Sequence, residues 1–317
     1  MQRQGNKSPF VAIFIMTCVT IPVTSFQCGY ETIGCFKDTS NRAIQTLEGK
    51  DSILDGSYGT RKSPIAKCAL AAMQRGYKIF AVQNGGECFS SATADETFDV
   101  HGGTAACGFD GEGGPWANQV YLIKDFDTIG CFKDTSYRAI PVLEGKDSIL
   151  DGLYGARKNP IAKCAVAAMR RGHKIFAVQN GGECFSSRAV ETTFDRYGGS
   201  AACGSDGEGG KWANHVYLIK DFDPLGCFND TLTRAIETLE GKDSILDRSY
   251  GARKNPIAKC AVAAMRKGYK MFAVQNGGWC AASATAYDTF DKYGRSAACR
   301  PDGEGGPLAN QVYVTSC

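Results

Sequence analysis

The feature that most constrains this chain is a threefold repeat of its cysteines. Cys35 recurs as Cys131 and Cys227, a constant step of 96 residues, and the other three cysteine positions of each repeat keep that step. A period of this length is too long for a solenoid repeat and suits a small independent domain. Because no insertion breaks the register, the sequence predicts three tandem modules with one fold. The predicted boundaries are 28–124, 125–220 and 221–317.

The centre of each module predicts one helix that leads directly into one strand. In the first module, Ser63 suits the N-cap and Pro64 the first helical position, and apolar residues then recur at helical spacing. Gly76 suits a left-handed C-cap. Residues 77–83 are largely apolar on both sides, which predicts an inner strand of a small sheet. The turn at residues 84–86, Asn-Gly-Gly, ends that strand.

Shorter elements flank this centre. We expect a first strand through Cys35, a short second strand at residues 42–44, and a last strand at the end of residues 110–123, where apolar and polar residues alternate. The predicted fold class is therefore α+β. It consists of three tandem small disulfide-stapled modules, each with one helix packed on a small antiparallel sheet.

The start of the chain predicts export. Residues 1–25 combine a basic start, a short apolar stretch and small residues before a cleavage point, as a secretory signal peptide does. An uncleaved membrane anchor is the alternative, although the apolar stretch is short for a span. After cleavage, which removes Cys18, the number of cysteines is even, and an even count in a secreted chain predicts a disulfide framework. We expect a secreted, extracellular protein without membrane insertion after signal cleavage.

Four cysteines in each module allow three pairings. We favour a bond from the helix to the strand end and a second bond between the outer pair. The favoured bonds are Cys68–Cys88 and Cys35–Cys107, Cys164–Cys184 and Cys131–Cys203, and Cys260–Cys280 and Cys227–Cys299. Cys28 and Cys317 remain, one at each end of the chain. They either join the first and third modules or link separate chains into a disulfide-linked oligomer, and both alternatives stay open.

Charge and histidine usage argue against several function classes. The formal net charge is only +3, so no nucleic-acid partner is expected. His101, His173 and His215 occupy unrelated positions in the three modules, and no metal-ligand spacing or nucleophile motif accompanies them. We therefore expect no enzyme activity, no catalytic residues and no cofactor.

Two further positions suggest modification or ion binding. Asn229 begins the Asn-Asp-Thr sequon, which predicts N-glycosylation on a eukaryotic secretory route. Asp110 and Glu112 lie in a glycine-rich loop and are weak candidates for calcium ligands, although an acidic turn explains them better.

The repeated pattern resembles a known extracellular module. GCF.D…RAI, then C…A…GY..FAVQNGG.C, then a closing N.VY is similar to the WSC module across all three repeats, and more loosely to the PAN/apple class. The resemblance implies a helix pinned to a sheet by disulfides and an association with carbohydrate binding.

A sugar site needs planar amide or carboxylate groups for hydroxyls and an aromatic face for the ring. The third module has Leu308 at the position of Trp116, and its own tryptophan stands where the other modules have glutamate. The alternative is that Asn84 only forms a turn and Trp116 packs between modules. The predicted carbohydrate-binding residues are Gln83, Asn84, Trp116, Asn118, Gln179, Asn180, Trp212, Asn214, Gln275, Asn276, Trp279 and Asn310.

Three functions follow from these observations, in order of preference. The first is a secreted multivalent protein that binds glycans or glycoproteins of the cell surface or extracellular matrix. The second is a structural or matrix protein assembled through its repeats and terminal cysteines. The third is a secreted defence or toxin-like effector that binds a protein partner.

Overall fold

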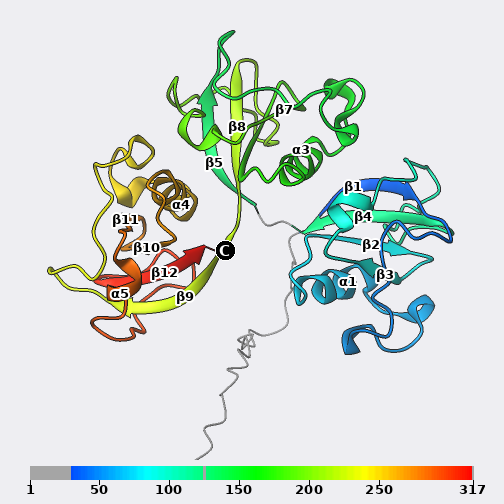
Figure 1. Cartoon of the computed structure of the whole chain (residues 1–317), viewed down its shortest axis with the longest axis horizontal. Helices are drawn as coiled ribbons and strands as arrows, with labels where there is room; N and C mark the ends of the chain where they lie inside the picture. Colours follow the sequence, from blue (N-terminus) through cyan, green and yellow to red (C-terminus); the bar gives the residue numbers. More distant parts are fainter. Residues whose placement is uncertain (1–29, 124–125, 316–317) are drawn as a thin grey trace, which may run out of the picture.

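The computed structural model describes residues 30–123 and 126–315. The predicted signal peptide, Cys28 and Cys317 lie outside the described residues. Three similar units follow one another along the chain and are arranged around a common centre (Figure 1). Each unit contains a four-stranded antiparallel sheet, a helix and disulfide bonds. The predicted α+β class with tandem, disulfide-stapled modules is therefore confirmed.

The first module shows the plan that the others repeat. Its strands are β1 Tyr30–Lys37, β2 Ile79–Gln83, β3 Glu87–Ser90 and β4 Ala117–Ile123. Its helices are α1 Pro64–Met73 and the short α2 Ala94–Thr97, with 3-10 turns η1 Ser52–Leu54 and η2 Tyr58–Thr60 before α1.

The second and third modules contain the corresponding elements. The second has β5 Phe126–Lys133, η3 Ser148–Leu150, η4 Tyr154–Ala156, α3 Pro160–Met169, β6 Ile175–Gln179, β7 Glu183–Ser186, η5 Val190–Thr192 and β8 Ala213–Ile219. The third has β9 Phe222–Asn229, η6 Ser244–Leu246, η7 Tyr250–Ala252, α4 Pro256–Arg266, β10 Met271–Gln275, β11 Trp279–Ala281, α5 Ala286–Thr289 and β12 Ala309–Thr315.

The strand order explains why the module centre is apolar on both sides. The order in the first sheet is β1-β4-β2-β3, so β2 is an inner strand, and all five of its residues are buried. Phe80 pairs with Tyr121 and Ala81 pairs with Val120 in the antiparallel register of β2 and β4. The rings of Phe80 and Tyr121 stack beneath α1.

The ends of α1 match the sequence prediction only in part. Pro64 opens the helix, where its missing N–H needs no partner, and Gly76 follows the helix with a φ of 70°. Ser63 lies at the N-cap position, but its side chain makes no capping hydrogen bond. Its φ of 52° is left-handed, whereas a capping residue adopts the extended backbone that directs its oxygen to the first turn. The predicted side-chain cap is therefore wrong.

Two strand predictions need correction. Residues 42–44 form no strand, because the N–H of Ala43 donates to the Asp38 carboxylate at 3.0 Å instead of joining a ladder. Conversely, Cys88 lies within β3, which forms a hairpin with β2 across the Asn-Gly-Gly turn and was not predicted. Strand β3 is only four residues long, too short for its alternation to be recognised.

The disulfide pairings are those favoured from the sequence. Cys68–Cys88 ties α1 to β3, and Cys35–Cys107 ties β1 to the loop before β4. The corresponding bonds in the other modules are Cys164–Cys184, Cys131–Cys203, Cys260–Cys280 and Cys227–Cys299. The chain-entropy estimate is about 3 kcal/mol for each bond with a sequence separation of 20 and about 4 kcal/mol for each with a separation of 72, mainly by restricting the unfolded chain.

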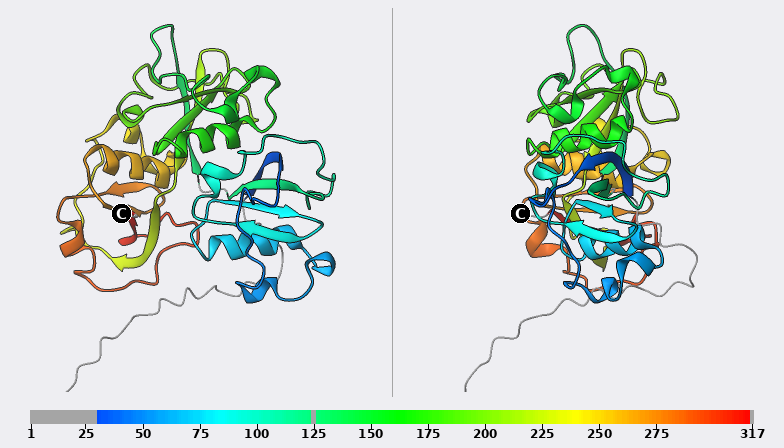
Figure 2. Two further views of the ribbon diagram at one scale, coloured as in Figure 1. Left: turned by 45° about the vertical axis from the view of Figure 1, so that its right-hand side comes forward. Right: turned by 90° about the vertical axis from the view of Figure 1, so that its right-hand side faces the viewer.

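The modules pack against one another, because the helices α3 and α4 each contact two modules. Helix α3 packs on its own sheet and also contacts β1 of the first module, and α4 contacts β5 of the second. Two of the hydrophobic clusters therefore run across module boundaries. Figure 2 shows α3 on the side of the second module that faces the first.

Candidate ligand-binding surface

An arginine over a tryptophan is the most distinctive exposed arrangement in the first module. Arg42 follows β1 and donates to the buried Asp38 carboxylate at 2.6 Å. Its guanidinium carbon lies 4.8 Å from the centre of the Trp116 indole and 5.0 Å from that of the Phe89 ring. Such cation–π contacts are worth about 0.5–1 kcal/mol at exposed sites. Arg42 is thus held in place by a carboxylate and two aromatic rings.

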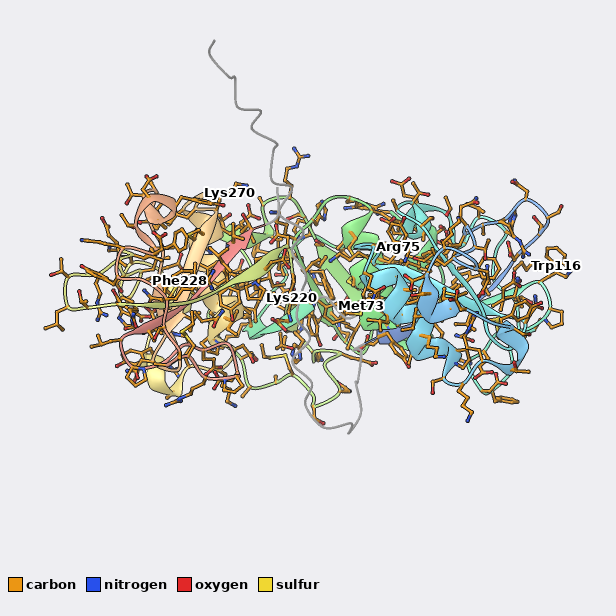
Figure 3. The ribbon with its side chains drawn as sticks, turned by 90° about the horizontal axis from the view of Figure 1, so that it is seen from below. Met73, Arg75, Trp116, Lys220, Phe228 and Lys270 are labelled. Carbon is orange, nitrogen blue, oxygen red and sulfur yellow. A yellow bond between two sulfur atoms is a disulfide. The ribbon has the colours of Figure 1, made fainter. Side chains whose placement is uncertain are left out.

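The backbone presents Trp116 to solvent. Trp116 has a left-handed φ of 55°, and its carbonyl accepts a hydrogen bond from the Asp38 N–H at 2.9 Å. The side chain is 53% exposed. Trp116 is therefore anchored through its main chain while one face of its indole remains accessible, and Figure 3 places it at the outer edge of the molecule.

Polar groups beside Arg42 continue this surface. Asn84 donates from Nδ2 to Glu87 Oε2 at 2.9 Å, and Glu87 lies 4.0 Å from the Arg42 guanidinium. An indole, a guanidinium, a carboxylate and an amide therefore lie next to one another. We call Trp116, Arg42, Glu87 and Asn84 the Trp–Arg surface.

The second module repeats the Trp–Arg surface closely. Arg138 pairs with the buried Asp134 at 2.8 Å and lies 4.8 Å from the centre of the Trp212 indole. Asn180 donates to Glu183 at 2.9 Å, as Asn84 does to Glu87 in the first module.

The third module builds the same pair from a different tryptophan. Leu308 occupies the position of Trp116, with a similar φ of 49°. Trp279 stands where the other modules have glutamate, and its indole centre lies 4.3 Å from the Arg234 guanidinium. Asn276 donates to the Tyr250 hydroxyl at 3.2 Å instead. The arginine therefore lies over an indole in every module, but in the third module the indole comes from a different position in the sequence.

The remaining predicted residues lie beneath this surface. These buried amides are Gln83, Asn118, Gln179, Asn214, Gln275 and Asn310. Gln275 donates to Asp230 at 2.9 Å, and Gln179 donates to Asp134 at 3.3 Å. Gln179 and Gln275 thus support the carboxylate, whereas the side-chain polar atoms of Gln83, Asn118 and Asn214 are buried without a hydrogen-bond partner among the described residues. Contact of these six amides with a ligand stays a prediction.

The buried carboxylate remains charged. Burial alone raises the pKa of Asp230, but hydrogen bonds from the Ala235 N–H, Arg234 and Gln275 outweigh it, so the pKa lies below its ordinary value. An ionised Asp230 fixes the position of the arginine at neutral pH.

The arginines were not among the binding residues predicted from the sequence. Asp38 and Arg42 are four residues apart, and this spacing recurs in the pairs Asp134–Arg138 and Asp230–Arg234. The sequence does contain a signal for them, because an aspartate and an arginine four residues apart recur in every module.

The glycine-rich loop of Asp110 is held by its own contacts. Asp110 accepts from the Glu112 N–H at 2.9 Å, as expected for an acidic turn. A Cβ on Gly113 would lie 2.2 Å from the Val82 carbonyl oxygen, so glycine is required there. Within residues 30–123 and 126–315, no group of three or more His, Cys, Asp or Glu side chains is arranged to hold a metal ion.

The other predicted residues have ordinary surroundings. His101 contacts the Asn41 carbonyl at 2.9 Å, His173 contacts the Ser186 hydroxyl at 2.9 Å, and His215 stacks on a tyrosine, so the three do not converge. Asn229 lies at the end of β9, where Nδ2 donates to two backbone carbonyls. Its glycosylation stays a prediction.

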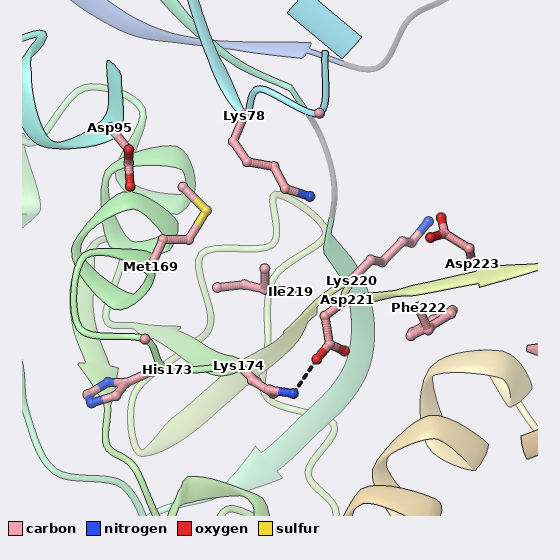
Figure 4. A pocket seen from close by; sticks show the side chains of 12 residues that line it. Lys78, Asp95, Met169, His173, Lys174, Ile219, Lys220, Asp221, Phe222 and Asp223 are labelled. Carbon is pink, nitrogen blue, oxygen red and sulfur yellow. Dashed lines mark hydrogen bonds and ion pairs between the residues drawn. The ribbon is translucent and has the colours of Figure 1, made fainter. Parts of the chain in front are cut away.

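A hollow of about 590 Å³ lies at the centre, where the three modules meet (Figure 4). Lys174 forms an ion pair with Asp221, and Lys220 pairs with Asp127 at 3.1 Å. Burial lowers the pKa of the nearby Lys78 ammonium. None of the residues that line this hollow belongs to a Trp–Arg surface. Of the two ion pairs, Lys174–Asp221 joins the second module to the third, whereas Lys220–Asp127 lies within the second.

Comparison with models of known protein families gives no match, and no curated protein matches the chain in sequence. Among the helices of the described ranges, none has the length and apolar character needed to cross a membrane.

Proposed function

We propose that this protein is a secreted, multivalent carbohydrate-binding protein whose modules each bind through their Trp–Arg surface. The observation that carries the proposal is the exposed Trp116–Arg42 pair, which recurs as Trp212–Arg138 and is rebuilt as Trp279–Arg234. An indole face packs against the apolar side of a sugar ring. The guanidinium, carboxylate and amide beside it supply donors and acceptors for hydroxyl groups.

Multivalency supports the same proposal. Each surface is small and open, so a single contact is weak, whereas three sites on one chain raise the effective affinity for a surface bearing many glycans. The packing of helices across module boundaries fixes the sites relative to one another. The resemblance to the WSC module, which is associated with carbohydrate binding, points in the same direction.

The test is a glycan array probed with the full-length chain, with and without calcium. The full-length chain is required because α3 and α4 each pack both on their own module and on the preceding one. A variant carrying W116A, W212A and W279A should lose binding, while F109A, which removes an exposed aromatic ring outside the Trp–Arg surface, should bind normally. Circular dichroism should show unchanged secondary structure in both.

Two results would contradict the proposal. Unchanged binding by the triple variant would exclude the indoles as the contact. Absence of binding by the wild-type chain to every glycan would favour the structural or protein-binding alternatives.

A further inference from the structure

The interface between the first and second modules has the same contacts as the interface between the second and third. Arg170 of the second module donates to Asp99 at 2.8 Å and to the Asp95 carbonyl at 2.6 Å, both in the first module, and lies 5.0 Å from the centre of the Phe98 ring. It also pairs with Asp147 of its own module at 2.8 Å. One side chain thus connects two modules through charge, hydrogen bonds and ring contact.

The next interface repeats this arrangement. Arg266 donates to Asp195 at 2.8 Å and to the Glu191 carbonyl, and it lies 5.1 Å from the centre of the Phe194 ring. It pairs with Asp243 at 2.7 Å. The interface is heterologous, since a helix of one module meets the sheet side of the preceding one.

An apolar stripe completes each contact. In α3, Ala162 and Val166 are fully buried in a cluster that includes Ile33 of β1. In α4, Val262 is equally buried, in a cluster that includes Ile129 of β5. The helix side is therefore aliphatic, and the sheet side offers one branched residue beside a phenylalanine.

The first module has the same helix stripe, but within the described residues this stripe is not buried as those of α3 and α4 are. Ala66 and Leu70 are only partly buried, and Met73 is 44% exposed. Figure 3 labels Met73 on the underside of the molecule, far from Trp116. This helix face is the free counterpart of the stripes that α3 and α4 bury.

The third module has the matching sheet side, and within the described residues this side is less buried than in the other two modules. Leu225, at the position of Ile33 and Ile129, is 37% exposed. Phe290 is partly buried and Asp291 is exposed, whereas Phe98 and Phe194 are fully buried at the corresponding positions.

One substitution weakens the free helix face. Gln74 stands where the other modules have Arg170 and Arg266. An amide can donate a hydrogen bond to Asp291 but brings no charge, and hydrogen bonds to charged partners gain about 1.5–3 kcal/mol against about 1 kcal/mol for neutral ones.

We propose that a second copy of this chain docks its α1 stripe on the β9 side of the third module, reproducing the inner interface between chains. The association is non-covalent and weaker than the inner contacts because Gln74 replaces the arginine. A heterologous contact of this kind either closes a ring or extends into a chain of copies. The inference is independent of the ligand proposed above.

The experiment is sedimentation velocity of the full-length chain over a concentration series. Cys28 and Cys317 are replaced by serine throughout, so that disulfide-linked oligomers do not contribute. Association should rise with protein concentration. Met73→Asp, on the helix face, and Leu225→Asp, on the sheet face, should each abolish it, whereas Leu153→Asp, at an exposed position in the middle module, should not.

Mixing the variants makes the test specific. Met73→Asp retains a competent sheet face and Leu225→Asp a competent helix face, so the two together should form dimers that do not grow. Gln74→Arg should tighten association about tenfold, by restoring the charged contact to Asp291. A chain that remains monomeric even with Gln74→Arg, or variants that associate like wild type, would overturn the proposal.

Discussion

Two arginines with similar partners have different surroundings. Arg170 and Arg42 both pair with a carboxylate and both lie over an aromatic ring. The Arg170 side chain is 13% exposed and bridges two modules, whereas that of Arg42 is 30% exposed and all its contacts lie within one module. The same residue types therefore hold modules together at one place and present a surface to solvent at the other.

The difference follows from how many partners each guanidinium has. Arg170 is paired with Asp99 and Asp147 and also donates to a backbone carbonyl, so its charge is satisfied out of water. Arg42 has one close carboxylate partner, Asp38, and Glu87 only at 4.0 Å. A ligand can therefore compete for the outer edge of Arg42 but not for Arg170.

The largest effect is expected from Arg170→Ala. Removing one partner of a largely buried ion pair leaves the others uncompensated, which costs about 3–5 kcal/mol. Urea unfolding of the full chain should show this loss, or separate transitions for the modules. Gln74→Ala is the matched control at the free helix face and should change stability by less than about 0.5 kcal/mol. If both changes lower the free energy of unfolding equally, α3 and α1 do not differ in their contacts as described above.

The second-largest effect is expected at acid pH, which should weaken the interface between the first and second modules. Burial raises the pKa of Asp147, but hydrogen bonds from Arg171 and the Ile149 N–H and the charge of Arg170 outweigh it, so the pKa lies below its ordinary value. The unfolded chain then takes up the proton first. The stabilisation is complete above the unfolded pKa, about 3.9, and is lost as pH falls through the folded value, by about 1.4 kcal/mol for each pKa unit of difference.

Unfolding free energies measured from pH 6 down to pH 2 check this expectation. Asp147→Asn should flatten the profile relative to wild type. A profile that stays equally steep in the variant would assign the acid sensitivity to other carboxylates, such as Asp230.

A smaller stability effect is expected from Trp116→Ala. The indole is half exposed, so the lost contact with Arg42 should lower the free energy of unfolding by about 0.5–1 kcal/mol. Glycan binding by the first module should fall more strongly than stability. If stability falls by several kcal/mol while binding is unchanged, the tryptophan is structural.

The smallest stability effect is expected when the third module is given the surface of the first two. The double change Leu308→Trp with Trp279→Glu replaces exposed or half-buried side chains by the residues that the first two modules have at the same positions, and the φ of Leu308 is similar to that of Trp116. The free energy of unfolding should therefore stay within about 0.5 kcal/mol of the wild-type value. On a glycan array, any preference specific to the third module should disappear. A preserved preference would place specificity elsewhere.

Local patterns predicted much of this fold. The period of the cysteines gave three modules, and the run from Pro64 to residue 83 gave the helix and its following strand. Helical spacing and a proline start are local signals, so they can be read without knowing the fold. Strand β3 escaped because it is four residues long and derives its stability from pairing with β2.

The candidate site was predicted less well, because exposure is not a local property. Gln83 and Trp116 were proposed together, yet Gln83 is buried and Trp116 is exposed. Sequence period alone does not show that Arg42, from a turn after β1, lies against an indole from the loop before β4. That contact depends on the sheet order, which pairs β1 with β4.

By itself, the sequence determined the number of modules, the α+β class, and the helix and strand at each module centre, because composition and spacing act over a few neighbouring residues. Tertiary structure alone decided which identical positions are buried and which are free. Ala162 and Ala66 have the same local sequence around them, but Ala162 packs against the first module and is fully buried, whereas Ala66 is only partly buried. Burial depends on the neighbour in space, and a repeated sequence does not show which of its identical faces has such a neighbour.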